Sequence, residues 1–270
     1  MRIGAMVAMN RQLEDRFREL REMGMASCQL VSWEEELFTE EMAEYVNCMK
    51  EKYGIDITAF WCGWDGPVVW NFYDGQETLG LVPAAYRDSR LKTLLKGSDF
   101  AKKIGVQDLV THVGFLPENP NERNYWDVIY ALRHLADKCR RNDQYFLFET
   151  GQETPVTLLR VIQDMGRENV GINFDPANLI LYGKANPVDA LDTIGKYIRG
   201  VHGKDGFYPT DGRCLGEETA LGEGKVNYPA LIKRLKEVGY DGDITIEREI
   251  SGEKQKEDIL KAKEILEKLI

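Results

Sequence analysis

Short apolar runs recur eight times along the chain, and amphipathic stretches separate most of them. The amphipathic stretches predict helices. In Leu13–Gly24 (LEDRFRELREMG), for example, apolar residues recur at helical spacing and a glycine closes the helix. The other helical patterns cover Leu91–Gly105, Tyr125–Arg141, Pro155–Gly166, Tyr228–Gly239 and Lys254–Leu269. The apolar runs predict strands at Arg2–Val7, Ser27–Ser32, Asp56–Gly63, Gln107–Val113, Gln144–Thr150, Val170–Asp175, Ile198–Lys204 and Asp243–Glu249.

Eight strands that alternate with helices indicate an α/β fold with one parallel sheet, and the count favours a closed (β/α)8 TIM barrel over an open sheet. Such a barrel takes about 250 residues. The chain has 270, so we expect a single domain over residues 1–270. No glycine-rich nucleotide-binding motif follows the first strand. The long connections, 64–84, 115–124 and 206–227, leave the carboxyl ends of strands, where barrel active sites lie.

Charge and cysteine usage narrow the classes of partner. The 35 basic and 45 acidic residues leave a formal charge of −10, and no basic cluster is present that would bind a phosphate backbone, so we expect no nucleic-acid partner. The five cysteines form no CxxC pair, which is typical of a reducing compartment. Met1–Val7 is too short and too soon polar for a signal peptide or a membrane span. We therefore expect a cytoplasmic protein with no membrane partner.

The last four predicted strands each end in an acid or a histidine: Glu149 in FLFE, Asp175 in INFD, His202 in VH and Glu247 in ITIE. Side chains alternate between the two faces of a strand, so these residues share a face while their bulky apolar neighbours occupy the other. The apolar face can pack on the surrounding helices. The four polar groups then converge in the mouth of the barrel.

Three carboxylates and an imidazole in one mouth would repel each other and lose solvation unless a cation lay among them. Oxygen-rich ligation with one nitrogen favours a divalent metal ion, Mn²⁺ first, with Mg²⁺, Co²⁺ and Zn²⁺ as alternatives. The competing interpretation gives each residue an ordinary role: the two glutamates cap helices, Asp175 begins a turn before Pro176, and His202 is a core histidine. Four such residues at matching strand ends favour the metal site over these separate explanations.

Further candidates for substrate binding lie at the same end of the predicted barrel. His112 ends the fourth strand in VTHVGF, where a histidine is more often functional than packed. Lys204 shares the face of His202 and is placed to bind a hydroxyl or a phosphate, or else to form a salt bridge with an acid such as Asp205. Glu223 lies between two glycines in LGEGKV, which allow either a close approach to a ligand or a purely structural turn.

Three tryptophans follow the second and third strands: Trp33, Trp61 and Trp64. Trp33 and Trp61 are candidate walls for a sugar ring. Large aromatic residues also fill space or form oligomer interfaces, so these alternatives stay open.

Several segments resemble the xylose isomerase-like TIM barrels known as sugar phosphate isomerases/epimerases. This family includes ketose 3-epimerases, inosose isomerases and dehydratases, and more distantly endonuclease IV. The resemblance covers the whole chain and implies that Glu149, Asp175, His202 and Glu247 are metal ligands, with Glu149 and Glu247 as the acid/base pair. It also makes a homo-oligomer an option. The segments that carry the likeness are THVGF (111–115), FETGQET (148–154), GINFDPANL (171–179), VHGKDG (201–206) and LGEGKVNYPALIKRLKEVGYDGDITIERE (221–249).

The sequence departs from the epimerase pattern at two positions. Epimerases of the family commonly have a substrate-contacting histidine three residues after the metal-binding aspartate, and here that position is Asn178, which can still bind a hydroxyl. Their second substrate glutamate, six residues after the first ligand, is replaced by Pro155, and Glu153 is the nearest substitute. The endonuclease interpretation is weaker still, because its three-zinc site needs more histidines than the three present.

These observations predict an enzyme of carbohydrate metabolism, a divalent-metal-dependent isomerase or epimerase of a small keto-sugar or keto-polyol, phosphorylated or not. Glu149 and Glu247 are the predicted acid/base pair, and the intermediate is an enediolate. The alternatives are an inosose-type dehydratase or a keto-glycoside lyase with the same metal site. A non-catalytic sugar-binding barrel or a complex subunit is the alternative from a different class.

Overall fold

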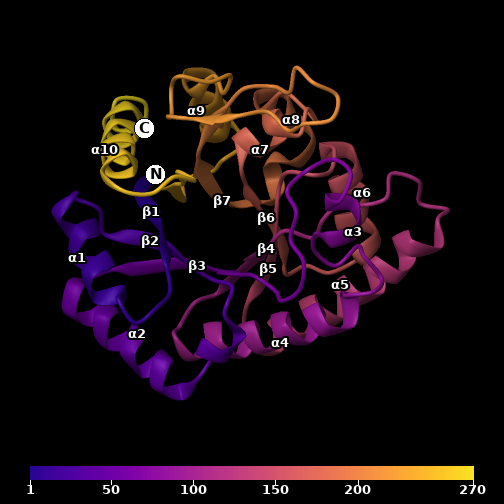
Figure 1. The fold of residues 1–270 in the computed structure, drawn as a ribbon, viewed down its shortest axis with the longest axis horizontal. Coiled ribbons are helices and arrows are strands. Elements are labelled where there is room, and N and C mark those ends of the chain that lie inside the picture. Colours follow the sequence, from indigo (N-terminus) through magenta and orange to yellow (C-terminus); the bar gives the residue numbers. More distant parts are fainter.

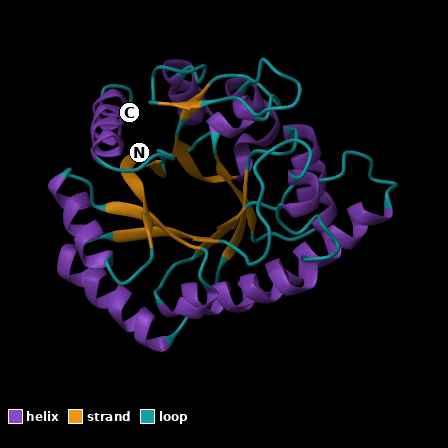
Figure 2. Cartoon of the chain, in the orientation of Figure 1, coloured by secondary structure: helices purple, strands orange, loops and turns teal.

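Eight parallel strands close into one barrel in the computed structural model, which describes residues 1–270 (Figures 1 and 2). Each strand lies within its predicted range except β1, which runs one residue further. The barrel order is β1-β10-β7-β6-β5-β4-β3-β2, so the first and last strands are neighbours. The strands are β1 (Arg2–Ala8), β2 (Ser27–Ser32), β3 (Asp56–Cys62), β4 (Asp108–Thr111), β5 (Tyr145–Glu149), β6 (Val170–Phe174), β7 (Ile198–Gly203) and β10 (Asp243–Ile246). The predicted (β/α)8 barrel is confirmed.

A ring of helices surrounds the strands (Figure 2). The long helices are α1 (Leu13–Glu22), α2 (Glu40–Tyr53), α4 (Arg87–Lys103), α5 (Arg123–Arg141), α6 (Pro155–Met165), α8 (Pro187–Ile194), α9 (Tyr228–Glu237) and α10 (Glu253–Glu267). Two shorter helices are α3 (Gly75–Thr78) and α7 (Pro176–Leu181), and two 3₁₀ turns are η1 (Glu35–Leu37) and η2 (Gly195–Tyr197). None of the helices combines the length and apolar character that a bilayer crossing requires.

Helix α4 begins earlier than its apolar pattern predicts. Its first turn is polar, and it contains Arg87 and Arg90, whose guanidinium groups bind carbonyl oxygens of the preceding loop. Arg87 Nε lies 2.7 Å from the oxygen of Leu81, and Arg90 Nη1 lies 2.8 Å from that of Gly80. Arg90 is fully buried. Hydrogen bonds of this kind leave no hydrophobic pattern, so the apolar periodicity predicts a helix start only at Leu91.

The main hydrophobic core lies between the strands and the helices. On β5, Phe146 and Phe148 belong to this core, whereas Leu147 packs inside the barrel with Trp61 and Trp64. On β6, the core likewise contains the two outward-facing apolar residues, Ile172 and Phe174. The apolar face of these strands thus meets the helices, and the alternate face, which carries the polar residues, points into the barrel.

The connection after β7 has some regular secondary structure of its own. It contains a short antiparallel pair, β8 (Asp205–Gly206) and β9 (Glu218–Thr219). The connection after β3 contains α3. Both connections contribute residues to the cavity at the carboxyl end of the barrel, Trp70 from the first and Leu215 from the second.

Candidate metal centre

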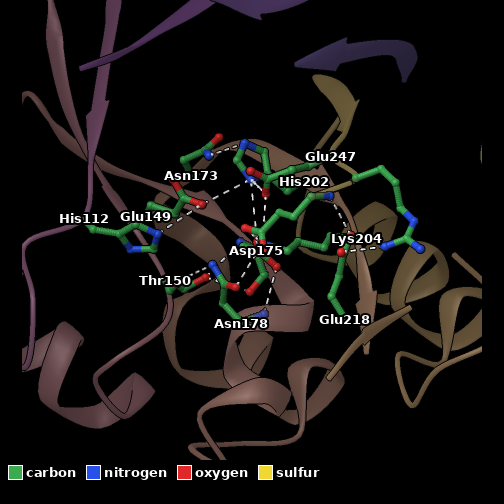
Figure 3. A network of polar contacts seen from close by, with 12 residues as sticks. His112, Glu149, Thr150, Asn173, Asp175, Asn178, His202, Lys204, Glu218 and Glu247 are labelled. Atoms are coloured by element: carbon green, nitrogen blue, oxygen red, sulfur yellow. Dashed lines mark hydrogen bonds and ion pairs between the residues drawn. The ribbon is translucent and has the colours of Figure 1, made fainter. Parts of the chain in front are cut away.

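Four side chains from neighbouring strands meet at the carboxyl end of the barrel: Glu149, Asp175, His202 and Glu247 (Figure 3). Each offers one ligand atom, and these atoms all lie within 4.8 Å of one another. His202 Nδ1 is central, 3.1 Å from Glu247 Oε2, 3.3 Å from Glu149 Oε1 and 3.7 Å from Asp175 Oδ2. The structure therefore brings together all four residues that the strand-end pattern singled out. We call them the four-residue cluster.

Two atoms of the four-residue cluster are buried without any hydrogen-bond partner: Asp175 Oδ2 and His202 Nδ1. Both side chains are fully buried, and Glu149 is only 3% exposed. Buried polar atoms in proteins are normally hydrogen-bonded, and a buried polar group left without a hydrogen bond costs about 1–3 kcal/mol. A divalent cation among these atoms would satisfy both of them at once. The donor set of three carboxylates and one imidazole thus fits a divalent metal ion.

Neighbouring opposite charges shift the pKa values of Glu149, Glu247 and His202 against the effect of burial. Burial raises the pKa of Glu149, but the facing imidazoles of His112 and His202 outweigh it and hold the pKa below its usual range. Burial also opposes ionisation of Glu247, yet Lys204 and His202 hold its pKa well below the usual range. Burial lowers the pKa of His202, whereas Glu149 and Glu247 raise it well above its usual value. Both glutamates are therefore ionised at neutral pH.

Asp175 both caps a helix and contributes to the four-residue cluster. Its Oδ1 accepts a hydrogen bond of 2.9 Å from the backbone N–H of Asn178, which makes it the N-cap of α7. Its backbone N–H donates to Thr150 Oγ1 at 2.8 Å, and Thr150 Oγ1 donates to the carbonyl of Asp175 at 2.9 Å. These bonds join the ends of β5 and β6 and leave Oδ2 aimed into the cluster. The helix-cap interpretation and the metal-ligand interpretation thus describe two oxygens of the same carboxylate.

The ring of His202 is positioned by two buried side-chain amides on the side opposite the carboxylates. Its Nε2 lies 2.9 Å from Gln29 Oε1 and 2.9 Å from Asn173 Nδ2, and Gln29 Nε2 donates to Asn173 Oδ1 at 2.8 Å. Gly200 leaves room for this arrangement, because a Cβ there would lie 2.3 Å from Asn173 Oδ1. With Nε2 directed at these amides, Nδ1 is the ring nitrogen that faces the carboxylates. Strand alternation places Asn173 on this face, but it does not reveal the role of either amide.

Lys204 is buried beside the four-residue cluster. Its Nζ lies 2.7 Å from Glu249 Oε1, 3.2 Å from Glu247 Oε2 and 3.5 Å from Asp175 Oδ2. Burial lowers the pKa of Lys204, but these carboxylates raise it well above its usual value. The side chain is 2% exposed and does not line the cavity, so its ammonium group is not available to a substrate. Of the two interpretations of Lys204, the structure shows the salt bridge, but the partners are acids that follow β6 and β10 rather than Asp205.

Glu149 is also contacted from its cavity side. Trp61 Nε1 donates to Glu149 Oε2, and His112 Nε2 lies 3.5 Å from Glu149 Oε1. The ring of His112 is flanked by the rings of Trp61 and Trp70, with centroids 5.9 and 5.3 Å away. Trp61 and His112 thus lie where the sequence analysis expected substrate contacts. Trp70 was missed, because it lies in a long loop where no periodic pattern marks it.

A cavity of about 500 Å³ opens above the four-residue cluster. Of the predicted site residues, those that line it are Trp33, Trp61, His112, Glu149, Asn178 and Glu247. Asn178 is 5% exposed, and its amide already bonds to the carbonyl of Thr150 and to Lys204. It remains within reach of a ligand at the floor of the cavity.

Besides Lys204, two predicted substrate-binding residues are not brought into this cavity. Glu153 is buried away from its lining, and burial raises the pKa of its carboxyl to about 7. Glu223 is exposed in a turn that Asp205 organises. Asp205 Oδ2 accepts hydrogen bonds from the backbone N–H groups of Gly222 at 2.9 Å and Gly224 at 3.1 Å. The glycines of LGEGKV therefore form a structural turn, and Glu223 points to solvent rather than to a substrate.

Among curated proteins, the chain is 36% identical to the uncharacterized protein MJ1311 of Methanocaldococcus jannaschii over 118 residues, which are 43% of this chain and 37% of that protein. The match thus spans well under half of that relative's length. A D-tagatose 3-epimerase-like protein shares the fold with a TM-score of 0.78 and 21% identity, covering 100% of this chain and 97% of that one.

A more similar solved structure is that of a xylose isomerase domain protein from Planctomyces limnophilus. It superimposes with a TM-score of 0.94 at 34% identity, covering 99% of this chain and 96% of that one. The model of the family described as xylose isomerase-like TIM barrel matches residues 17–269. This match agrees with the closed eight-stranded barrel and with the four-residue cluster at its carboxyl end. The chain therefore belongs to the xylose isomerase-like TIM barrel family.

Proposed function

We propose that this protein is a divalent-metal-dependent isomerase or epimerase that acts on a keto-sugar or keto-polyol. The observation that carries the proposal is a pair of glutamates, the buried Glu149 and the partly buried Glu247, at one cluster of potential metal ligands. They come from β5 and β10, the two outermost of the four adjacent strands that form the cluster. The similarity to a D-tagatose 3-epimerase-like protein agrees with this chemistry.

A divalent cation bound by the four-residue cluster would polarise a ketone and balance the negative charge that develops on its oxygen. One glutamate then takes the proton from the carbon next to the ketone, which gives an enediolate. The other glutamate returns a proton to the opposite face of that carbon, which is epimerisation, or to the adjacent carbon, which is isomerisation. A divalent cation at the cluster would favour the ionised form of both carboxylates, so either could serve as the base.

Neighbouring side chains hold these two carboxylates in place. The indole N–H of Trp61 binds Oε2 of Glu149, and the ammonium group of Lys204 binds Oε2 of Glu247 at 3.2 Å. Each of the two carboxylates is thus fixed by a different donor, and no exposed flexible side chain is involved. For the metal we propose Mn²⁺, because three oxygen ligands and one nitrogen suit it, as they also suit Mg²⁺, Co²⁺ and Zn²⁺.

Proton–deuterium exchange tests the proposal. Ketoses, keto-inositols and their phosphates are incubated in D₂O with the protein, with Mn²⁺ or with EDTA, and the carbon-bound protons are followed by NMR. We expect exchange with Mn²⁺, none with EDTA, and a loss of about 10²–10⁴-fold in Glu149→Gln or Glu247→Gln. Glu223→Gln is the matched control, because that glutamate is exposed outside the cavity, and it should exchange like the wild type.

The same spectra separate the reaction types, since an epimer, an isomer and a dehydrated product differ in their signals. Metal-bound protein that exchanges no proton on any member of the panel would contradict the proposal and favour a barrel that only binds its ligand.

A further inference from the structure

The cavity above the four-residue cluster is divided between two halves of the barrel. Strands β5, β6, β7 and β10 carry the cluster, whereas β1, β2 and β3 contribute only apolar side chains. The residues that continue this apolar side around to α10 include Ile250 and Ile259. We call the following set the apolar wall: Met6, Val31, Trp33, Trp61, Ile250 and Ile259.

No basic side chain is free to bind an anionic substrate group in this cavity. Arg248 is the only lysine or arginine that lines it. Its Nη1 lies 2.6 Å from Glu218 Oε2 and its Nε lies 2.9 Å from Asp258 Oδ2, so its guanidinium is already paired with two acids. Lys204 is buried among carboxylates. A phosphate is bound best by charged donors, and the cationic side chains in and beside this cavity are already paired with carboxylates.

Acidic groups dominate the charged part of the lining. Glu149, Glu247 and Glu249 all border the cavity. The N-terminus of α10 also lies near it, but the first turn of that helix carries Glu253, and the amide of Gln255 already donates to a backbone carbonyl. The carboxylate in the first turn already offsets the positive end of this helix, so the helix end adds little attraction for an anion.

The cavity is also larger and more apolar than one reacting sugar ring requires. Its volume of about 500 Å³ is in the range of pockets for larger, drug-sized ligands. Of its 18 lining residues, 11 are hydrophobic, so a single polar ring at the four-residue cluster would leave most of this surface without a partner. Trp33 is 41% exposed, and its ring packs at a tilt against Trp61 and edge-to-face against Trp64, at centroid distances of 5.0 and 5.2 Å. An exposed indole backed in this way is a rigid platform for a second ring.

We infer that the substrate is an uncharged keto-glycoside, in which the ketone-bearing ring lies at the four-residue cluster and a second, uncharged ring packs on the apolar wall. This inference rests on the proposed function and deepens it by naming the substrate class. The glycosidic bond occupies the anomeric carbon, so the ketone lies on another carbon of the ring. The pairing of Arg248 with two acids also disfavours sugar phosphates.

Calorimetric binding to the Mn²⁺-loaded protein tests the inference with three probes. They are the methyl and phenyl glucosides oxidised to a ketone at carbon 3, and the 6-phosphate of the methyl compound. We expect the phenyl glucoside to bind about tenfold or more tightly than the methyl glucoside, because its ring buries apolar surface on the wall. We expect the phosphate to bind more weakly than the methyl glucoside. A phenyl glucoside that binds no more tightly, a phosphate that binds as tightly, or no binding of any probe would overturn the inference.

Two variants locate the second ring. Trp33→Ala and Ile259→Ala should each reduce the preference for the phenyl probe several-fold and leave the affinity for the methyl probe within about twofold. Trp126→Ala is the matched control. Trp126 lies on α5, and its exposed fraction of 39% is similar to the 41% of Trp33, but it does not line the cavity. An unchanged phenyl preference in both cavity variants, or an equal loss in Trp126→Ala, would contradict the assignment.

Exchange in D₂O on the same probes separates this inference from the proposed function. The expected order of affinities without exchange on any probe would refute the enolising activity and leave the binding inference standing. Exchange on the methyl probe with the opposite order of affinities would refute the substrate class alone.

Discussion

Removal of the amide that orients His202 should weaken metal binding without touching a ligand. Gln29 is 2% exposed, and its Oε1 lies 2.9 Å from His202 Nε2. For Nδ1 to bind a metal, Nε2 must carry the ring proton, and Gln29 Oε1 is the acceptor for that proton. Gln29→Met keeps the length of the side chain and removes the acceptor. The imidazole then loses the contact that fixes its tautomer and its orientation.

The size of the effect follows from what the substitution leaves unpaired. Loss of such a partner behind a metal ligand lowers metal affinity by about 10–100-fold, or about 1.4–2.7 kcal/mol. Folding stability falls as well, because Asn173 Oδ1 loses the 2.8 Å hydrogen bond from Gln29 and His202 loses its acceptor. Each orphaned buried group costs about 1–3 kcal/mol.

The assay is calorimetric titration of EDTA-stripped protein with Mn²⁺, combined with urea unfolding. Gln144→Met is the matched control. Gln144 is also 2% exposed, and its amide bonds to Ser98 and Val106, but it precedes β5 at the end opposite to Glu149. It should lose stability and keep its Mn²⁺ affinity within about twofold. An unchanged affinity in Gln29→Met, or an equal loss in Gln144→Met, would refute the reasoning.

Three further substitutions test other parts of the account. Asp175→Ala should bind no Mn²⁺ by elemental analysis and keep a native circular dichroism spectrum, with about 1 kcal/mol lost from the α7 cap; unchanged metal content would contradict the assigned ligands. Lys204→Met should destabilise the EDTA-stripped protein by about 3–5 kcal/mol, because it leaves the carboxylates of Asp175 and Glu247 without their ammonium partner. Saturating Mn²⁺ should reduce this loss of stability. An equal loss with and without Mn²⁺ would contradict the idea that Lys204 and the metal ion balance the same carboxylates. Burial raises the pKa of Glu153 from 4.5 to about 7, so the wild type loses stability as the pH rises through that range. Glu153→Gln should therefore be more stable than the wild type by about 3 kcal/mol at pH 8 and only about 1 kcal/mol at pH 5 in urea unfolding. A stability difference that does not change with pH would contradict the raised pKa of Glu153.

The barrel and the four-residue cluster could be predicted because both follow from local periodicity. Apolar runs of strand length recur between helical patterns, and strand alternation puts Glu149 and Asp175 on the inward face of β5 and β6. Parallel strands in a closed barrel present their carboxyl ends at one edge, so matching strand ends converge without further information. Helix boundaries were less accurate where polar contacts decide them, as at Arg87 and Arg90.

The partners of individual side chains could not be predicted, because they come from distant segments. Lys204 is next to Asp205 in the sequence, but the backbone turns Asp205 toward the loop at Gly222. The ammonium group instead meets Glu247 and Glu249, more than 40 residues away. Gln29 reaches His202 across the barrel interior over 173 residues of sequence. No local pattern encodes such contacts.

The rate of proton–deuterium exchange, measured as Mn²⁺ is titrated into EDTA-stripped protein, tests the central claim most directly. The account predicts that exchange on a keto-sugar substrate rises from zero, reaches its plateau at one Mn²⁺ per chain, and is abolished in Glu149→Gln although that protein remains folded. Exchange at full rate without metal, or undiminished exchange in Glu149→Gln, would contradict it.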